Sequence, residues 1–217
     1  MEICRLASAR AHLGPNQLQV NGRSHSPLQV GQRAARCGVA RLVCIIASQG
    51  GRERGLILHK LLEEVLTGET DAAVAALAER AGVLIRALGR SPVADPATGL
   101  SAEELADRVV QTLALPEIAA LRPELLAEFP VYAARAVGGD ETATIGIADA
   151  LTLTAEGLPA VVVDWKSDVN PDPLTLDHYR AQVRAYLDMT GAQRGLIVLM
   201  TTGAVIIVSP SGRTMAA

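Results

Sequence analysis

The sequence predicts an α/β protein with a mixed β-sheet that is flanked by helices. Apolar residues at helical spacing in residues 55–66 indicate a first helix. Two apolar runs joined by a glycine-containing turn at 142–165 indicate a β-hairpin, and a second such pair lies at 195–209. In chain order the prediction is a helix, a helical block, three strands, a helix and two strands. This order is typical of an α/β fold with a mixed sheet.

The helical part precedes the strands. The first helix is expected to end at Gly68, because glycine readily adopts the left-handed conformation of a helix C-terminus. Residues 71–90 are rich in alanine and leucine, and Ser101 to Glu104 form a capping box that begins a helix to about residue 115. A short helix follows Pro116. We interpret residues 70–123 as a helical insertion whose charges lie on solvated faces.

The first three strands are expected at 126–136, 142–153 and 160–165, with a tight turn at 137–141. Asp149 lies in the second strand, and Asp164 and Lys166 end the third. Because side chains alternate along a strand, Asp164 and Lys166 project to one side and Trp165 to the other. Two carboxylates on neighbouring strands are suitable oxygen ligands for Mg²⁺.

A second helix is expected from Asp172, its N-cap, and Pro173 to about residue 189, before Gly191. His178, Gln182 and Tyr186 recur every four residues and share one face of this helix. Arg180 and Arg184 lie on another flank, where they could meet phosphates. Residues 195–201 and 204–209 predict a final hairpin, with its first strand deep in the sheet.

Asp149, followed by Asp164-Trp165-Lys166, resembles the signature of the PD-(D/E)XK nuclease superfamily. The pattern is most similar to the RecB/AddA-type, UvrD-helicase-associated nuclease domains of helicase–nuclease complexes. That branch has an upstream helix with a histidine, which corresponds to His59 within residues 54–63. It also has a downstream Gln-x-x-x-Tyr helix, which corresponds to Gln182 and Tyr186. The resemblance covers about residues 51–208.

The resemblance implies a restriction-endonuclease-like fold and a Mg²⁺-dependent DNA exonuclease of recombinational repair, with Mn²⁺ as an alternative ion. Asp149 and Asp164 would hold the metal, the backbone carbonyl of Trp165 would add an oxygen, and His59 would complete the shell. Lys166 would orient or deprotonate the attacking water. Gln182 and Tyr186 would position the DNA strand. Glu128 is a further candidate ligand, because the family often has an acidic residue there.

Two alternatives remain open: a catalytically inactive DNA-binding or scaffolding module of the same fold, and a restriction or phage-type nuclease. A net charge of -3 counts mildly against a DNA-binding domain that acts alone. The sequence has no Gly-x-x-x-x-Gly-Lys-Ser/Thr loop, so no ATP site is expected and a helicase would be a separate subunit. Three cysteines without a Cys-x-x-Cys pair argue against a zinc site or an iron–sulfur cluster.

The expected domain organisation has three parts. Residues 1–50 form a poorly ordered or atypical N-terminal segment, residues 51–209 form the nuclease domain, and residues 210–217 form a tail. The first residues lack the layout of a signal peptide, and no apolar run reaches the roughly 18 residues of a membrane span. We therefore expect a cytoplasmic protein that binds DNA and no membrane.

Overall fold

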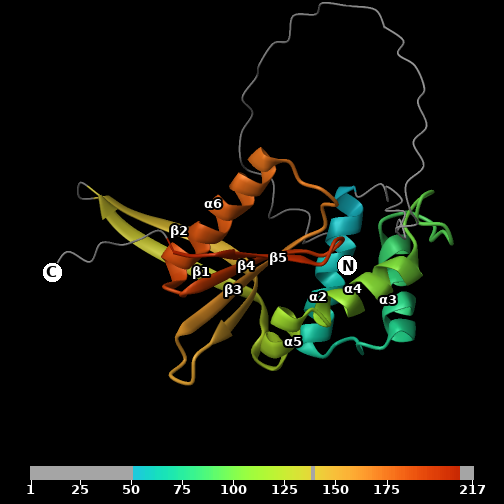
Figure 1. The fold of residues 1–217 in the computed structure, drawn as a ribbon, viewed down its shortest axis with the longest axis horizontal. Coiled ribbons are helices and arrows are strands. Elements are labelled where there is room, and N and C mark those ends of the chain that lie inside the picture. Colours follow the sequence, from blue (N-terminus) through green and yellow to red (C-terminus); the bar gives the residue numbers. More distant parts are fainter. Residues whose placement is uncertain (1–50, 138–139, 211–217) are drawn as a thin grey trace, which may run out of the picture. The chain divides into compact units, whose positions relative to one another are not determined.

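A five-stranded mixed sheet lies at the centre of the computed structural model, which describes residues 51–137 and 140–210 (Figure 1). The helices before the sheet are α2 (Arg52–Thr67), α3 (Val74–Ala87), α4 (Ala102–Leu113), α5 (Pro116–Leu121) and the 3₁₀ helix η1 (Arg122–Glu124). The remaining elements are β1 (Leu126–Val137), β2 (Asp140–Leu153), β3 (Pro159–Lys166), α6 (Pro173–Thr190), β4 (Arg194–Leu199) and β5 (Ala204–Val208). The predicted order of helices and strands is confirmed.

The strands follow one another in the order β1-β2-β3-β4-β5. Only the pairing of β3 with β4 is parallel among these strands; the other three pairings are antiparallel. A parallel pair needs a crossover connection, and α6 supplies it. The final hairpin turns at Gly203, whose φ is 75°. Residues 138 and 139 of the expected turn at 137–141 lie outside the described residues. Residues 1–50 and 211–217, for which a separate N-terminal segment and a tail are expected, also lie outside them.

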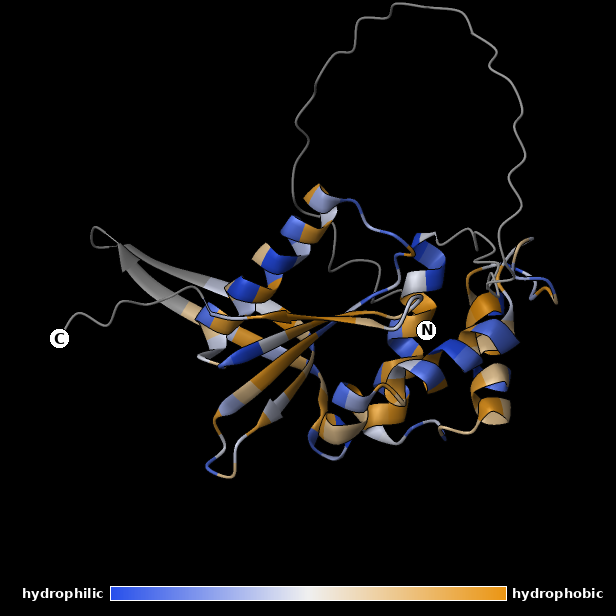
Figure 2. Ribbon diagram, viewed as in Figure 1, coloured by the Kyte–Doolittle hydropathy of each residue, from blue (hydrophilic) through white to orange (hydrophobic). Residues whose placement is uncertain are grey.

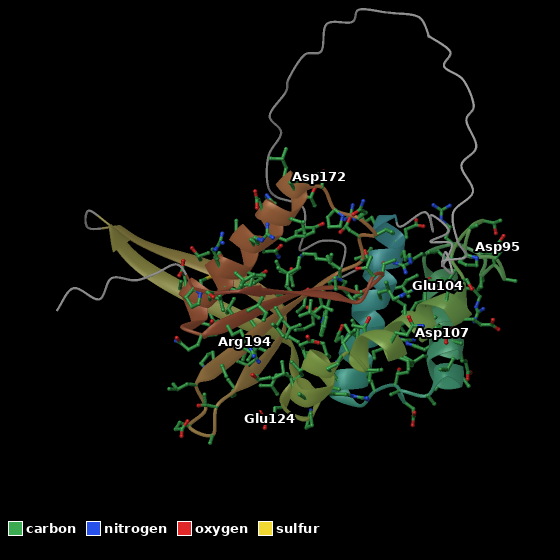
Figure 3. All side chains as sticks on the ribbon, viewed as in Figure 1. Asp95, Glu104, Asp107, Glu124, Asp172 and Arg194 are labelled. Carbon is green, nitrogen blue, oxygen red and sulfur yellow. The ribbon has the colours of Figure 1, made fainter. Side chains whose placement is uncertain are left out.

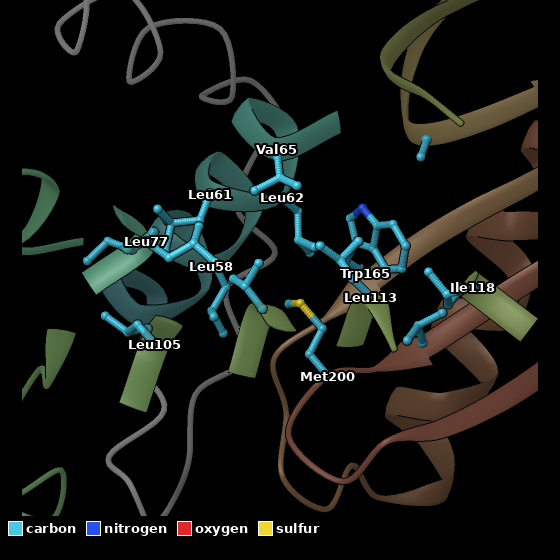
Figure 4. Close-up of a cluster of buried hydrophobic side chains, with 14 of the residues drawn as sticks. Leu58, Leu61, Leu62, Val65, Leu77, Leu105, Leu113, Ile118, Trp165 and Met200 are labelled. Carbon is cyan, nitrogen blue, oxygen red and sulfur yellow. The ribbon is translucent and has the colours of Figure 1, made fainter. Parts of the chain in front are cut away.

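Helices cover both faces of the sheet and form two apolar cores. Helices α2–α5 pack on one face, where Trp165 lies among Leu62, Leu113 and Met200 (Figure 4). Helix α6 packs on the other face through Val183 and Leu187. The central strands are hydrophobic along most of their length, as expected for strands that are buried on both faces (Figure 2). Strand alternation holds in β3, where Val161, Val163 and Trp165 face one core and Val162 faces the other.

The predicted helix ends are also confirmed. Helix α2 ends at Gly68, with φ of 79°, and α6 ends at Gly191, with φ of 76°. The side chain of Asp172 caps α6 by accepting a hydrogen bond of 2.9 Å from the backbone N–H of Thr175. These caps satisfy backbone groups that have no partner inside the helix. Within the described residues, no helix is long and apolar enough to span a membrane.

One expectation for the helical block is wrong. Ser101 caps α4 as predicted, but the carboxylate of Glu104 is not on a solvated face. Glu104 lies where α4 passes α2 (Figure 3), and its side chain, which is 19% exposed, pairs with the buried Arg54. A local capping motif predicts where a helix begins, whereas the partner of its acidic side chain depends on the tertiary structure.

Gly195 allows α6 to pack closely on β4, because a Cβ atom at this position would collide with Cγ1 of Val183. We expect Gly195→Ala to lower the free energy of unfolding by about 1–3 kcal/mol, the usual cost of overpacking a core. The control is Gly82→Ala in α3, where the new Cβ meets only the movable guanidinium of Arg86 at 3.4 Å. That change should stabilise the helix by up to about 1 kcal/mol. Denaturant unfolding monitored through Trp165, the single tryptophan, measures both; equal effects would contradict this account.

Candidate active site

The candidate site lies where strands β2 and β3 separate. Their pairing runs from Leu153 to Ala150 on β2 and ends at the Ala150–Val163 pair. The residues that follow this last pair are Asp149 and Asp164. The backbone N–H of Trp165 donates a hydrogen bond of 2.9 Å to Oδ2 of Asp149. The Asp149 carboxylate therefore replaces a backbone carbonyl of β2 as the acceptor for this N–H. We call the point beyond the Ala150–Val163 pair, where β2 and β3 diverge, the fork; both aspartates lie there.

Strand β2 changes face at Asp149. Ala148 packs in the core beneath α6, whereas Ala150 packs in the core beneath α2–α5. Regular alternation would place these two residues on the same face. On β1, Glu128 lies opposite Asp149, between the Ala127–Ala150 and Phe129–Ala148 pairs, and has a φ of 49°. Such conformations are uncommon for residues other than glycine and concentrate at functional sites. Glu128 and Asp149 thus occupy opposite positions on β1 and β2, at an irregular point of both strands.

Asp164 and Lys166 project together toward α6, as strand alternation predicts. The Lys166 Nζ atom lies 3.1 Å from Oδ1 and 2.8 Å from Oδ2 of Asp164, and only the Oδ1 contact has hydrogen-bond geometry. Nζ also donates to Oε1 of Gln182 at 3.1 Å. The Gln182 amide in turn donates to the hydroxyl of Tyr186 at 3.4 Å. The β3 strand end and α6 therefore hold one ammonium group between them.

Helix α2 brings His59 to the other side of the fork. Its Nδ1 atom lies 3.5 Å from Oδ1 of Asp149, at the outer limit of a polar contact. Burial would lower the pKa of His59, but the neighbouring Asp149 carboxylate outweighs it, and the pKa of His59 is raised. The sequence-predicted histidine, both aspartates and the lysine therefore come from three elements, α2, β2 and β3, and lie in one cluster.

The two aspartates have opposite pKa shifts. Burial raises the pKa of Asp164 to about 6, and Lys166 only partly opposes this effect. Burial also acts to raise the pKa of Asp149, but the pairing with His59 and the N–H of Trp165 reverse it, so that the pKa of Asp149 is lowered. Neighbouring carboxyl groups with separated pKa values are typical of sites that carry chemistry.

The donor atoms of this cluster fit a divalent cation. Among the described residues, Nδ1 of His59 and Oδ2 of Asp164 are buried without a hydrogen-bond partner, and the fork also holds the Asp149 carboxylate. The carboxylate oxygens suit Mg²⁺ or Mn²⁺. Within residues 51–137 and 140–210, no three such side chains are close enough to hold an ion as they stand. The two oxygens of Asp164 are instead both in contact with Nζ of Lys166.

Helix α6 brings some predicted residues to the site and not others. His178 and Arg184 are exposed, and Arg180 pairs with Asp177 on its own helix at 2.9 Å. The sequence reasoning missed Tyr179, whose ring centre lies 4.7 Å from Nζ of Lys166. Its hydroxyl donates to Asp168 at 2.6 Å. The spacing of Tyr179 to Gln182 and Tyr186, three and seven residues, is a helix-face signal that could have identified it.

Comparisons with known proteins identify a family for this chain. A family model described as PD-(D/E)XK nuclease superfamily matches residues 35–210. Among solved structures, the crystal structure of SSO0001 is similar, with 19% sequence identity and a TM-score of 0.37, over 75% of this chain and 80% of that chain. That similarity is too weak to carry an argument. No curated protein sequence matches the chain. The family match spans more than half of the chain and includes the whole candidate site.

Proposed function

The chain belongs to the PD-(D/E)XK nuclease superfamily and has its restriction-endonuclease-like α/β fold, and from this premise we propose that it is a Mg²⁺-dependent deoxyribonuclease. Membership of this superfamily implies a nuclease in general terms. The observation that carries the finer proposal is the cluster of Asp149, Asp164 and Lys166 at the fork between β2 and β3. A partly buried lysine held between a carboxylate and a helix has a clear use in phosphodiester hydrolysis.

Asp149 and Asp164 would hold the cation, with His59, the carbonyl of Trp165 and Glu128 as further candidate ligands. When bound, Mg²⁺ (or Mn²⁺) neutralises phosphate charge and lowers the pKa of a coordinated water. The Trp165 side chain is buried in the core and the backbone N–H of the same residue donates to Asp149, so the packing of α2–α5 helps to orient that carboxylate. Such rigid support keeps a constellation of ligands within the narrow tolerance that catalysis needs.

Lys166 would orient the attacking water and stabilise the charge that develops on the phosphate. Its ammonium group has one partner on its own strand, Asp164, and one on α6, Gln182. Tyr186 holds the amide of Gln182, so Gln182 and Tyr186 would act on DNA partly by positioning Lys166. Arg184 is exposed, and together with Arg180 it would meet phosphates of the DNA backbone.

We further propose an exonuclease of the RecB/AddA type that acts in the cytoplasm in recombinational repair, with a separate helicase subunit as partner. This finer proposal is supported by the order of four motifs: His59 on α2, Asp149 on β2, Asp164 with Lys166 on β3, and Gln182 with Tyr186 on α6. The alternative of an inactive scaffold would not require Lys166 to be held beside Asp164.

The direct test is cleavage of linear single-stranded, linear double-stranded and circular DNA by the purified chain with Mg²⁺ and with EDTA. We expect Mg²⁺-dependent degradation of linear DNA, and loss of that activity in EDTA. Degradation of circular DNA at the same rate would favour a restriction or phage-type nuclease over an exonuclease. A folded chain that neither cleaves DNA nor binds Mg²⁺ would contradict the proposal and favour the scaffold.

Tyr179 offers a test of how α6 supports Lys166. Replacing Tyr179 with leucine removes the ring that faces the ammonium group, a contact worth roughly 0.5–2 kcal/mol. We expect kcat for DNA cleavage to fall about tenfold, since each 1.36 kcal/mol of lost stabilisation is a factor of ten. Tyr179→Phe keeps the ring and removes the bond to Asp168, so it should retain most of the activity. If phenylalanine and leucine were equally harmful, the hydroxyl rather than the ring would matter.

A further inference from the structure

Arg54 is almost completely buried, with 1% of its surface exposed, and it lies five residues before His59 on α2. Its guanidinium donates to Glu104 on α4 through Nη2 at 2.7 Å and through Nε at 3.4 Å. A buried arginine is costly unless it is fully paired, and Glu104 supplies the opposite charge. The pair with Glu104 uses the Nε and Nη2 atoms and leaves Nη1 to other partners.

The other side of the guanidinium meets the residue that follows Lys166. Nη1 donates to Oγ1 of Thr201 at 3.1 Å and approaches the carbonyl oxygen of Ser167 at 3.4 Å. The Thr201 hydroxyl donates to the same carbonyl at 2.8 Å. The carbonyl of Ser167 therefore accepts hydrogen bonds from α2 and from the turn between β4 and β5. We call Arg54, Glu104 and Thr201 together the Ser167 clamp.

Two neighbouring contacts tighten the same region. The backbone N–H of Met200 donates to the carbonyl of Lys166 at 2.8 Å, and Arg108 donates to the carbonyl of Thr201 at 2.9 Å. Gly55 also lies close to Ser167, because a Cβ atom at position 55 would be 2.9 Å from its hydroxyl oxygen. The backbone on the C-terminal side of Lys166 is thus fixed by groups from helices α2 and α4 and from the β4–β5 turn.

We propose that Arg54 and Thr201 are positioning residues, which fix the carbonyl of Ser167 and thereby the ammonium group of Lys166 relative to the α2 helix that carries His59. The inference rests on the proposed nuclease function. Lys166 is the last residue of β3, beyond the end of the β2 pairing, so its backbone lacks β2 on one side. The clamp restrains the residue that directly follows Lys166. A displacement of about 1 Å at a reacting group can cost about 100-fold in rate.

The test uses Thr201→Val, which removes the hydroxyl from the clamp at nearly constant shape. We expect kcat for Mg²⁺-dependent DNA cleavage to fall about 10- to 100-fold, with KM for DNA within about twofold of the wild type, because the clamp acts on position and not on binding. Thr201→Ser restores the hydroxyl and should restore the rate. The matched control is Thr202→Val in the same turn, whose hydroxyl bonds only Leu199 and Ala204 among the hydrogen bonds found.

A second measurement does not depend on activity. The chain has two lysines, Lys60 and Lys166, so labelling lysine with ¹³C at Cε gives two assignable side-chain NMR signals. We expect Thr201→Val to shift or broaden the Lys166 signal and to leave Lys60 unchanged, whereas Thr202→Val should change neither. Wild-type kcat in Thr201→Val would overturn the proposal. If the folded wild-type chain neither cleaves DNA nor binds Mg²⁺, the nuclease function fails, and an unmoved Lys166 signal would then overturn the positioning role separately.

Discussion

Replacing Lys166 by methionine is expected to reduce kcat for DNA cleavage by about 10²- to 10⁴-fold, the usual contribution of a positioned proton-transfer group. Methionine keeps the length and apolar stem of the side chain but has no ammonium group. Asp164 and Gln182 both lose the donor that lies 3.1 Å from each of them. The DNA would still bind, since Arg180 and Arg184 of α6 are unchanged. Cleavage of linear DNA under saturating Mg²⁺ measures the effect.

Lys60→Met is the matched control, because Lys60 is the other lysine of the chain. Its ammonium group pairs with Glu63 at 3.0 Å and Glu64 at 3.7 Å on the same helix. Pairs of this kind contribute only about 0.3–0.5 kcal/mol to stability, so we expect activity close to wild type. Trp165 fluorescence verifies that both variants are folded. Equal activities of the two variants would remove Lys166 from the mechanism.

The parts of the site that the sequence predicted depend on local rules. Alternation along β3 places Asp164 and Lys166 together, and the turn that reverses the chain at Gly157, with φ of 80°, sets β2 beside β3. The capping signals at Asp172 and Gly191 position α6 and hence Gln182. These rules involve residues that are close in sequence. One amino-acid sequence is therefore enough to predict the features that depend on them.

Other parts of the site depend on contacts between segments far apart in the chain. Arg54 and Glu104 are fifty residues apart, and Arg54 and Thr201 are 147 apart. The sequence shows Arg54 only as a charged residue in a helix, and its burial follows from packing. The change of face at Asp149 likewise comes with the φ of 49° at Glu128, a conformation that glutamate rarely adopts and that its residue type does not predict.

Asp164→Asn is expected to raise the stability of the fold and to lower the activity. Burial raises the pKa of Asp164 in the folded protein to about 6, above its ordinary value of 3.8. Between these values the folded state binds more protons than the unfolded state, so the free energy of unfolding falls as pH rises. At pH 8 the buried charge therefore lowers the free energy of unfolding by, at most, on the order of a few kcal/mol. Asparagine has the same shape without the charge.

Without divalent cation at pH 8, Asp164→Asn should therefore raise the free energy of unfolding by about 1–3 kcal/mol, or Tm by several degrees. Lys166 would keep its contacts with Gln182 and the Tyr179 ring, which limits the loss from the broken pair. The advantage should vanish near pH 4, where Asp164 is protonated. Asp172→Asn is the control, since asparagine caps a helix about as well as aspartate.

The same variant should lose at least about 100-fold in kcat and the rise in Tm that Mg²⁺ gives the wild type, because asparagine is a poorer ligand for a hard cation. If the Asp164 carboxylate destabilises the fold but is needed for activity, its role is chemical. Packing and stability alone would favour the asparagine amide at this position. If Asp164→Asn instead lowered Tm at pH 8 as much as at pH 4, the Asp164–Lys166 pair would be a structural ion pair. Burial of the Asp164 carboxylate would then not be a cost that the fold bears for activity.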